Sequence, residues 1–289
     1  MAQLRDLGTR SVIARIAEEI RFEHSVFALP FAYLGMILAA RGLPTLSQVL
    51  WITVAMVAAR TLAMSANRLI DRELDARNPR TSRRALPTGR LTSRQMLLAS
   101  VASLAVFLFA AAQLNPLCLA LAPFAAAFVV GYSYTKRFTI LSHFFLGLAD
   151  AIAPVGGWLA VAGSLSAEPI VLALAVAAWI GGFDVIYACQ DVEFDREHGL
   201  HSIPARYGIA TALRVSSWMH IFTAVALLAL WPIAHLGYAY LVGWAISCAL
   251  LVYEHRLVRP DDLSKLGIAF FNVNGYIAVV LFVFTYLGL

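Results

Sequence analysis

Apolar stretches and short polar segments alternate along the whole chain. Each apolar stretch has roughly 16 to 25 residues, about the length that an α-helix needs to cross the hydrocarbon core of a bilayer. The pattern predicts nine transmembrane helices and therefore an all-α, polytopic membrane bundle. The expected helix cores are residues 22–40, 47–67, 93–114, 116–135, 140–163, 168–190, 210–231, 234–254 and 267–287.

The segment before the first stretch has a different pattern. Residues 1–21 contain no uninterrupted apolar core of the kind found in a signal peptide, so we expect them to remain on the mature chain. Val12, Ile16 and Ile20 share one side of a helix, which predicts a short helix lying at the membrane interface. No linker or low-complexity segment divides the rest, and we expect residues 1–289 to form one transmembrane domain.

Composition supports a membrane protein. Of the 289 residues, 61% are hydrophobic and only 13% are charged, whereas about a quarter of the residues in a soluble domain are charged. Cys118, Cys189 and Cys248 stand alone in apolar stretches, which predicts small buried side chains and neither a disulfide nor a zinc site. The net charge of +5 does not imply a nucleic-acid partner, because in a membrane protein the position of the basic residues matters more than their sum.

Basic residues gather on one side of the predicted bundle. Of the 22 Lys and Arg residues, only Arg41 falls in a loop opposite the N-terminus, and only Arg60 falls in the interior of a predicted span, because Arg94 and Arg214 lie in the first turns of theirs on the N-terminal side. Loops rich in Lys and Arg face the cytoplasm. We therefore expect an integral protein of the cytoplasmic membrane, with the N-terminus inside the cell and the C-terminus outside.

Two of the predicted helices end in acidic residues on this basic side. Asn67, Asp71 and Asp75 are each four residues apart and line one face of an α-helix, with Arg60 deeper on the same face. The helix predicted at 168–190 ends in a similar way. Its residues of the same kind are Asp184, Tyr187, Asp191 and Asp195. Both helix ends lead into polar loops with Pro and Gly, which indicates a faint internal repeat whose halves run in the same direction.

Aspartates at a bilayer are costly to desolvate unless something compensates them, so these residues predict a functional site. Hard oxygen ligands beside basic residues suit Mg²⁺ that keeps some waters and bridges to the oxygens of a diphosphate. The expected Mg²⁺ ligands are Asn67, Asp71, Asp75, Asp191 and Asp195. The expected diphosphate contacts are Arg72, Lys136 and Arg137. The other interpretation is that the aspartates are solvated helix-end charges paired with nearby arginines.

These residues resemble the motifs of a known family. Residues 67–75, NRLIDRELD, look like the first NxxxDxxxD motif of the UbiA-type intramembrane prenyltransferases, and residues 187–195, YACQDVEFD, look like the second. The chain is most similar to the 4-hydroxybenzoate polyprenyltransferase group, including members of the futalosine route to menaquinone. The resemblance covers the chain as far as about Gly208. It implies a bundle around a central cavity, Mg²⁺ ions that hold a polyprenyl diphosphate, and a lateral opening for the lipid tail.

The resemblance implies Mg²⁺-dependent transfer of a polyprenyl group to an aromatic acid, either 4-hydroxybenzoate or a dihydroxynaphthoate, in quinone biosynthesis. We expect Lys136 to stabilise charge on the departing diphosphate, and Asp191 or Asp184 to take the ring proton or to orient the phenol through Tyr187. The expected acceptor contacts are Arg60, Asp184 and Tyr187. Aromatic residues available to wall the cavity and exclude water are Phe22, Phe27, Phe31, Trp179, Phe183, Phe270, Phe271 and Tyr276.

Arg68 departs from the family pattern, because many members have Asp directly after the asparagine, so the first site has one carboxylate fewer and a more positive rim. A UbiA-type enzyme acting on homogentisate, haem, chlorophyllide or a glycerol phosphate would share the same motifs. A cation or metabolite transporter would be a function of another class, but carboxylates at one membrane face and parallel repeats argue against it. The sequence gives no sign of an obligatory protein partner.

Overall fold

The computed structural model describes residues 11–20 and 25–289, with the backbone alone for residues 25–28, 270 and 271. Nearly all of this part of the chain is helical, and its one extended pairing is an isolated bridge between Arg259 and Asp262. The long helices are α3 (Ser25–Ala40), α4 (Leu46–Ile70), α6 (Ser93–Leu114), α7 (Pro116–Gly131), α8 (Ser142–Ala162), α9 (Ala167–Ala188), α12 (Ile209–Ile233), α13 (Tyr238–Leu257) and α14 (Asn274–Gly288). The short elements are α2 (Val12–Glu19), α5 (Arg72–Arg77), η2 (Tyr132–Arg137), η3 (Cys189–Asp191), α10 (Val192–Glu197), α11 (Ile203–Tyr207) and the π-helical turn η4 (Ile268–Val273).

Each apolar stretch predicted from the sequence coincides with one long helix. Among the described residues, six helices are long and apolar enough to cross a membrane, so the chain is an integral membrane protein. They are α4, α6, α7 together with η2, α8, α9 together with η3 and α10, and α12. Helices α3 and α14 are apolar but shorter, and α13 does not belong to this group, so the predicted count of nine spans is not confirmed.

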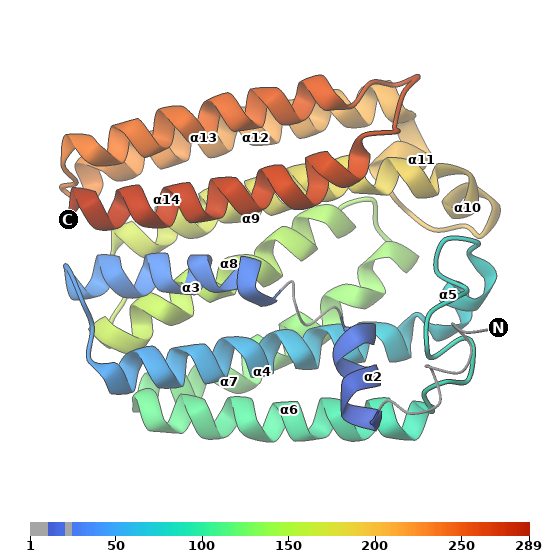
Figure 1. Ribbon diagram of the computed structural model, residues 1–289, viewed down its shortest axis with the longest axis horizontal. Helices are drawn as coiled ribbons and strands as arrows, with labels where there is room; N and C mark the ends of the chain where they lie inside the picture. Colours follow the sequence, from blue (N-terminus) through green and yellow to red (C-terminus); the bar gives the residue numbers. More distant parts are fainter. Residues whose placement is uncertain (1–10, 21–24) are drawn as a thin grey trace.

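Helix α2 lies within the predicted interfacial segment 1–21, of which residues 1–10 and 21 lie outside the described part. It runs across the direction of the long helices (Figure 1). Val12 and Ile16 on its apolar side pack against a cluster in the loop after α5 and at the start of α6. The carboxylate of Glu19 accepts a hydrogen bond from the backbone N–H of Ala85, at 2.7 Å. These contacts fix α2 against the polar loop.

Polar residues in the loops set where the long helices begin. Thr45 starts α4 in a capping box with Gln48, and Thr92 starts α6 in the same way with Gln95. Asn115 separates α6 from α7, and its side-chain oxygen accepts from the backbone N–H of Cys118 at 2.9 Å. Pro occupies the first position of α7, where its missing N–H costs nothing. Helices α6 and α7 are therefore joined in a tight hairpin at Asn115.

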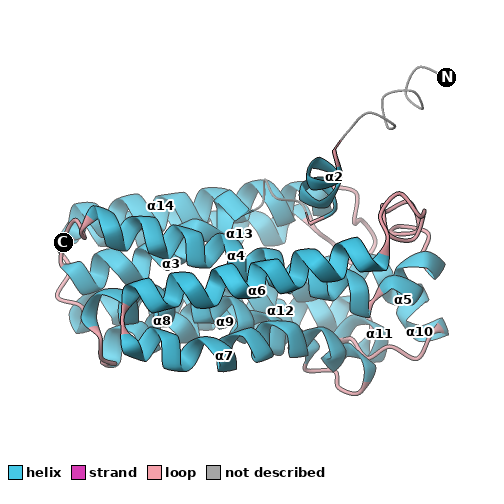
Figure 2. Cartoon of the chain, turned by 90° about the horizontal axis from the view of Figure 1, so that it is seen from below, coloured by secondary structure: helices cyan, strands magenta, loops and turns pink. Residues whose placement is uncertain are grey.

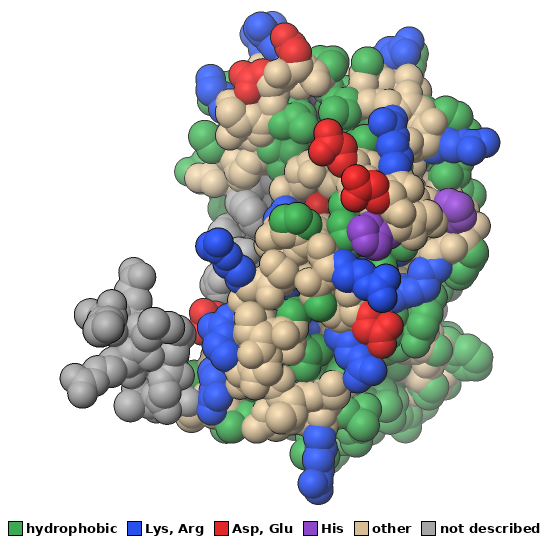
Figure 3. All heavy atoms as spheres, turned by 90° about the vertical axis from the view of Figure 1, so that its right-hand side faces the viewer, with side chains coloured by type: hydrophobic (Ala, Val, Ile, Leu, Met, Phe, Trp, Pro, Cys, Tyr) green, Lys and Arg blue, Asp and Glu red, His purple; other side chains and the backbone are tan. Residues whose placement is uncertain are grey.

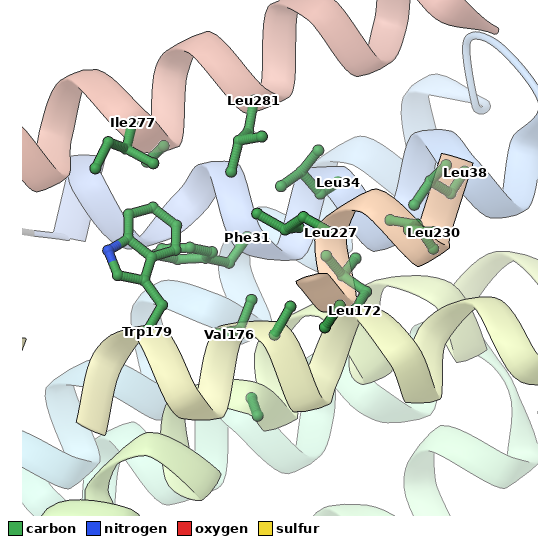
Figure 4. Packing of buried hydrophobic residues seen from close by; sticks show 14 of the residues in the cluster. Phe31, Leu34, Leu38, Leu172, Val176, Trp179, Leu227, Leu230, Ile277 and Leu281 are labelled. Atoms are coloured by element: carbon green, nitrogen blue, oxygen red, sulfur yellow. The ribbon is translucent and has the colours of Figure 1, made fainter. Parts of the chain in front are cut away.

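The long helices lie side by side in one bundle, as Figures 1 and 2 show from two directions. Small residues allow the closest crossings. A Cβ added at Gly157 of α8 would strike the backbone carbonyl of Ala32 of α3, and one at Gly147 would strike that of Ala177 of α9. A large apolar core fills the space between α3, α9, α12 and α14, in which the rings of Phe31 and Trp179 meet edge to face at 5.1 Å (Figure 4).

The two ends of the bundle differ in polarity. The short elements α5, α10 and α11 and their loops lie at one end, whereas α14 finishes at the opposite end (Figure 1). Figure 3 looks at the first end and shows Lys, Arg, Asp, Glu and His side chains gathered on it. We call this the polar end. Arg41 lies at the other end, where its guanidinium bonds the carbonyl of Ala234 and faces Glu168 at 3.8 Å.

Candidate active site at the polar end

The first acidic motif lies where α4 gives way to α5. Asp71 is buried and forms ion pairs with Lys136 Nζ at 2.5 Å and with Arg137 Nη2 at 2.9 Å, both from η2. Asn67 donates from Nδ2 to Asp71 Oδ2 at 3.1 Å and to Ser133 Oγ at 3.2 Å. The structure thus brings together four residues that the sequence proposed for one site, together with Ser133.

Asp75, the next member of the motif, has a different partner. Arg84 Nη1 donates to both of its carboxylate oxygens, at 2.8 and 2.7 Å. Arg72, proposed as a diphosphate contact, is not brought to this cluster. Its guanidinium lies on the exposed side of α5, near Ser93 Oγ at 3.3 Å and Glu73 at 3.5 Å. The helix turn between Asp71 and Asp75 directs a side chain at position 72 away from the aspartates.

The second motif is held by residues of the loop that follows the first. Arg80 binds Asp191 through Nε at 3.0 Å and Nη2 at 2.5 Å, while Asn78 Nδ2 donates to the same carboxylate at 3.0 Å. Arg80 also donates to the hydroxyl of Tyr187 at 3.3 Å. Burial disfavours the charged guanidinium, but the hydrogen bond and charge of Asp191 outweigh it and raise the pKa of Arg80. The loop therefore ties the two motifs together.

The partners of Asp195 and Asp184 are a serine and a histidine, in place of the Lys and Arg partners of the other aspartates. Asp195 accepts a hydrogen bond from Ser202 Oγ at 2.7 Å. Asp184 lies 2.7 Å from His143 Nδ1, and the backbone N–H of Ile203 donates to His143 Nε2 at 3.3 Å. Because Nε2 accepts, Nδ1 carries the proton and donates to Asp184. The position of Asp184, proposed as an acceptor contact or a base, is thus set by a neutral histidine.

No three His, Cys, Asp or Glu residues in the described part of the chain come close enough to hold a metal ion by themselves. Basic side chains neutralise three of the four motif aspartates, Asp71, Asp75 and Asp191. Mg²⁺ commonly binds through one or two carboxylates, with phosphate oxygens and water as its other ligands. The separated aspartates therefore fit Mg²⁺ that arrives with a diphosphate better than a metal held by protein alone.

A cavity of about 590 Å³ lies between α4, α6, α7 and α8. At the end nearest the acidic cluster, its lining includes Met64, about one helical turn from Asn67, and Tyr132, which directly precedes Ser133. It extends to Leu114 and Cys118 near the far ends of α6 and α7. Most of its lining is apolar, with Arg60, Asp150 and Tyr132 as its polar and charged side chains. The cavity reaches from the polar end deep into the bundle, but it lies to one side, between four of the long helices, and not at the centre as the resemblance implied.

The expected aromatic walls lie elsewhere. Phe31 of α3 and Trp179 of α9 are buried in the large apolar core and do not line the cavity. Phe183 packs against that core, and Tyr276 is exposed. The cavity is instead walled by Phe107, Phe124 and Phe128. The side chains of Phe22, Phe27, Phe270 and Phe271 lie outside the described residues. Apolar composition alone does not tell which side of a buried helix faces a cavity.

Arg68 does not make the rim more positive, as the sequence suggested. Its side chain is buried and turns to α2, where Nε donates to the carbonyl of Glu19 at 3.3 Å and lies 3.8 Å from its carboxylate. Nη1 donates to Asn67 Oδ1 at 3.0 Å. Arg68 therefore orients the amide of Asn67, so that its NH₂ group points to Asp71.

Sequence reasoning assigned no individual role to Arg80, Arg84, His143 and Asp150. The two arginines belong to the loop segment RTSRRALPTG, residues 80–89, and loop residues carry no periodicity that tells which side chains point inward. His143 has no signal in the sequence. Asp150 does have one, because it is a carboxylate inside an apolar stretch and such residues are functional candidates by default.

Comparison with known proteins agrees with this geometry. Residues 28–276 match the sequence profile of the UbiA prenyltransferase family. The 4-hydroxybenzoate octaprenyltransferase of Aeromonas hydrophila is 31% identical over 246 residues, which cover 85% of this chain and 85% of that protein. The enzyme of the same name from Methylobacillus flagellatus is 30% identical over 252 residues, covering 86% and 83%.

Solved structures show the same fold. The apo structure of a UbiA homologue from Aeropyrum pernix K1 matches with a TM-score of 0.82 and 32% identity, covering 91% of this chain and 97% of that one. A UbiA homologue from Archaeoglobus fulgidus bound to DMAPP and Mg²⁺ matches with a TM-score of 0.68 and 19% identity, covering 94% and 99%. At the lower identity, the likeness concerns the fold alone.

Proposed function

The chain belongs to the UbiA prenyltransferase family, and we propose that it transfers a polyprenyl group from a polyprenyl diphosphate to an aromatic acid in an Mg²⁺-dependent reaction. The relatives named 4-hydroxybenzoate octaprenyltransferase support an acid of that kind, either 4-hydroxybenzoate or a dihydroxynaphthoate. The product would be a precursor of ubiquinone or menaquinone.

One observation carries the proposal, namely that a charged cluster and an apolar cavity adjoin. Asp71, Lys136 and Arg137 meet at the polar end, and the cavity begins about one helical turn deeper. A polyprenyl diphosphate has the same division, with a charged head and a long apolar tail. The head would bind at the cluster while the tail fills the cavity among the alanines and phenylalanines of α6 and α7.

The residues that would hold Mg²⁺ are Asn67, Asp71, Asp75, Asp191 and Asp195, and the bound ion would neutralise charge on the departing diphosphate. A homologue of the same fold from Archaeoglobus fulgidus has been solved with Mg²⁺ and DMAPP or GPP, which supports the metal dependence of the proposed reaction. Lys136, Arg137, Arg80 and Arg84 now neutralise the aspartates, and they can donate to phosphate oxygens once the carboxylates bind the cation.

The reaction forms a bond between the first prenyl carbon and an electron-rich ring carbon of the acceptor, while the bond from that prenyl carbon to the diphosphate oxygen breaks. Lys136 stabilises the charge that develops on the diphosphate. The apolar cavity wall keeps water from the allylic cation. The ring proton passes to a carboxylate at the polar end, for which Asp191, beside Tyr187, and Asp184 are the candidates.

Arg60 supports an acidic acceptor. It projects into the cavity from α4, about 10 Å along the helix from Asn67 at the start of the motif, and supplies a cation at that depth. Its Nε is buried and has no hydrogen-bond partner among the described residues. A planar guanidinium in this state can bind a carboxylate through two parallel hydrogen bonds.

The orientation in the membrane is part of the proposal, with the polar end and the N-terminus in the cytoplasm and the C-terminus outside. The gathering of Lys and Arg at the polar end supports it (Figure 3). Reporter fusions at Gly89 and at the C-terminus should report opposite sides, and the same side for both would contradict this orientation.

The test of function uses the purified chain in detergent or liposomes with radiolabelled prenyl diphosphates of several lengths. Candidate acceptors are 4-hydroxybenzoate, 1,4-dihydroxy-6-naphthoate, homogentisate and a glycerol phosphate. We expect a prenylated hydroxy acid identified by mass spectrometry. A product formed only from homogentisate or from the glycerol phosphate would refute the proposed acceptor, and ion flux in liposomes without any prenylated product would refute the enzyme.

A further inference from the structure

Asp150 is a carboxylate whose role the acidic motifs do not explain. It lies in the first half of α8, about 12 Å along the helix from its start at Ser142, and it lines the apolar cavity. It forms no hydrogen bond with any residue that the structure describes, and no basic group of that part of the chain lies within 4.0 Å of it. Such a carboxylate lacks the protein partner that an apolar site demands.

Arg60 is the counterpart of Asp150 in the same cavity. Both side chains line this cavity, Arg60 from α4 and Asp150 from α8, and they carry opposite charges. The two side chains are nevertheless too far apart for an ion pair, and Arg60 Nε is buried without a partner in the described residues. The cavity therefore holds a donor group and an acceptor group that face one space without satisfying each other.

The other carboxylate near this depth is already occupied. Asp184 accepts a hydrogen bond from His143, whose remaining ring nitrogen is itself bonded to the backbone. Asp150 has no such second residue to hold it. Arg60 Nε is buried without a partner among the described residues, and the half-buried Asp150 lines the same cavity. A donor and an acceptor that both remain free at one cavity suit a ligand that supplies the complementary groups.

We propose that Asp150 accepts a hydrogen bond from a hydroxyl group of the acceptor, whose carboxylate binds Arg60, so that the cavity selects aromatic acids that also carry a hydroxyl. This inference rests on the proposed prenyl transfer and adds the chemical feature by which the acceptor is chosen. A site built to bond a hydroxyl rejects an analogue without one, because its own buried polar group is then left unpaired. Asp150 is therefore a specificity-determining residue, and the sequence motifs of the polar end do not include it.

The experiment measures binding, so that it does not depend on turnover. Isothermal titration calorimetry of the purified chain in detergent gives the Kd of 4-hydroxybenzoate and of benzoate, which differ only in the hydroxyl. We expect the wild-type chain to bind 4-hydroxybenzoate about 10-fold or more tightly, as befits a hydrogen bond to a charged group. Asp150→Leu should bring the two Kd values together, and Asp150→Asn, whose amide oxygen still accepts, should keep part of the difference.

Met64→Leu is the control, because it changes an apolar side chain of the same cavity and should keep the wild-type preference. The inference is overturned if the wild-type chain does not prefer 4-hydroxybenzoate, or if Asp150→Leu keeps the full preference. If Asp150→Leu does not fold, Asp150→Asn decides, since an unchanged preference in that variant contradicts a charge-assisted bond. Failure of the proposed function would appear separately, as a chain that discriminates the two acids but transfers no prenyl group to either.

Discussion

At the scale of single residues, the motif aspartates are already neutralised by basic side chains. Lys136 and Arg137 pair with Asp71, Arg84 with Asp75, and Arg80 with Asp191. On binding Mg²⁺ and a diphosphate, both members of each pair would exchange one charged partner for another. The site can thus keep its charges compensated with and without substrate, which avoids the cost of an unpaired charge near the bilayer.

Asp71→Asn tests the motif at its most connected residue. The amide cannot replace the carboxylate toward Lys136, Arg137 or a metal ion, so kcat/KM for prenyl transfer should fall by about 100-fold or more. Glu73→Gln, two residues on and exposed, is the matched control and should retain activity. Activity of Asp71→Asn within a few fold of wild type, in a folded sample, would remove Asp71 from the site.

Arg60→Lys tests the acceptor contact. A point charge cannot reproduce the two parallel bonds of a guanidinium, so the KM of the aromatic acid should rise by about 10-fold while that of the prenyl diphosphate stays nearly constant. Michaelis curves for each substrate measure this split. Arg214→Lys, on the exposed side of α12, should change neither curve. A rise confined to the diphosphate KM would show that Arg60 does not bind the acid.

At the scale of elements, glycines decide how closely the helices pack. A methyl group at Gly157 would collide with the backbone of α3, and backbone cannot move aside as a flexible side chain can. Gly156, its neighbour, has open space where a Cβ would stand, because it faces the cavity. An added methyl group would therefore contact backbone at Gly157 and open space at Gly156.

Gly157→Ala should lower the melting temperature in detergent, corresponding to about 1–3 kcal/mol of overpacking. Gly156→Ala, the same change one residue earlier, should leave the melting temperature unchanged or raise it slightly, because alanine favours the helix. Thermal unfolding followed by intrinsic tryptophan fluorescence measures both. Equal melting temperatures for the two variants would mean that α3 and α8 do not approach as closely as described.

The helices themselves were predictable because their length and apolar composition follow directly from the thickness of a bilayer. The acidic faces were predictable too, since Asn67 and Asp71 are one turn apart on any α-helix. The link between Arg80 and Asp191, separated by 111 residues, was not, because it depends on how an irregular loop folds over the polar end. Phe31 and Trp179 were available from the sequence either as cavity walls or as core residues, and the structure places them in the core. The sequence could not decide between these roles, since both sides of α9 are equally apolar.

At the scale of the whole molecule, the polar end adjoins a cavity that lies on one side of the bundle, between α4, α6, α7 and α8. The cavity runs from Tyr132 at the polar end to Leu114 and Cys118 near the other, so its length is available to a long prenyl tail. Small side chains on α6 and α7 leave this space open, including the buried Ala111 and Ala122. The volume left by these residues would then limit the length of the chain that is transferred.

Ala122→Phe should shorten the preferred donor. A benzyl group at this position fills part of the cavity, so kcat/KM for long prenyl diphosphates should fall about 10-fold or more relative to that for geranyl diphosphate. Ala120→Phe, on the exposed side of the same helix, is the control and should leave the preference unchanged. Competition between short and long labelled donors measures the ratio, and an unaltered ratio in Ala122→Phe would place the tail elsewhere.

The requirement for Mg²⁺ joins the residues, the helix ends and the cavity in one function, and metal removal tests it most directly. The purified chain is treated with EDTA, freed of the chelator and assayed with a labelled polyprenyl diphosphate and 4-hydroxybenzoate while Mg²⁺ is titrated back. Without metal, transfer should fall below about 1% of the full rate, and Mg²⁺ should restore it in wild type but not in Asp71→Asn. Undiminished transfer in the presence of excess EDTA would contradict the account.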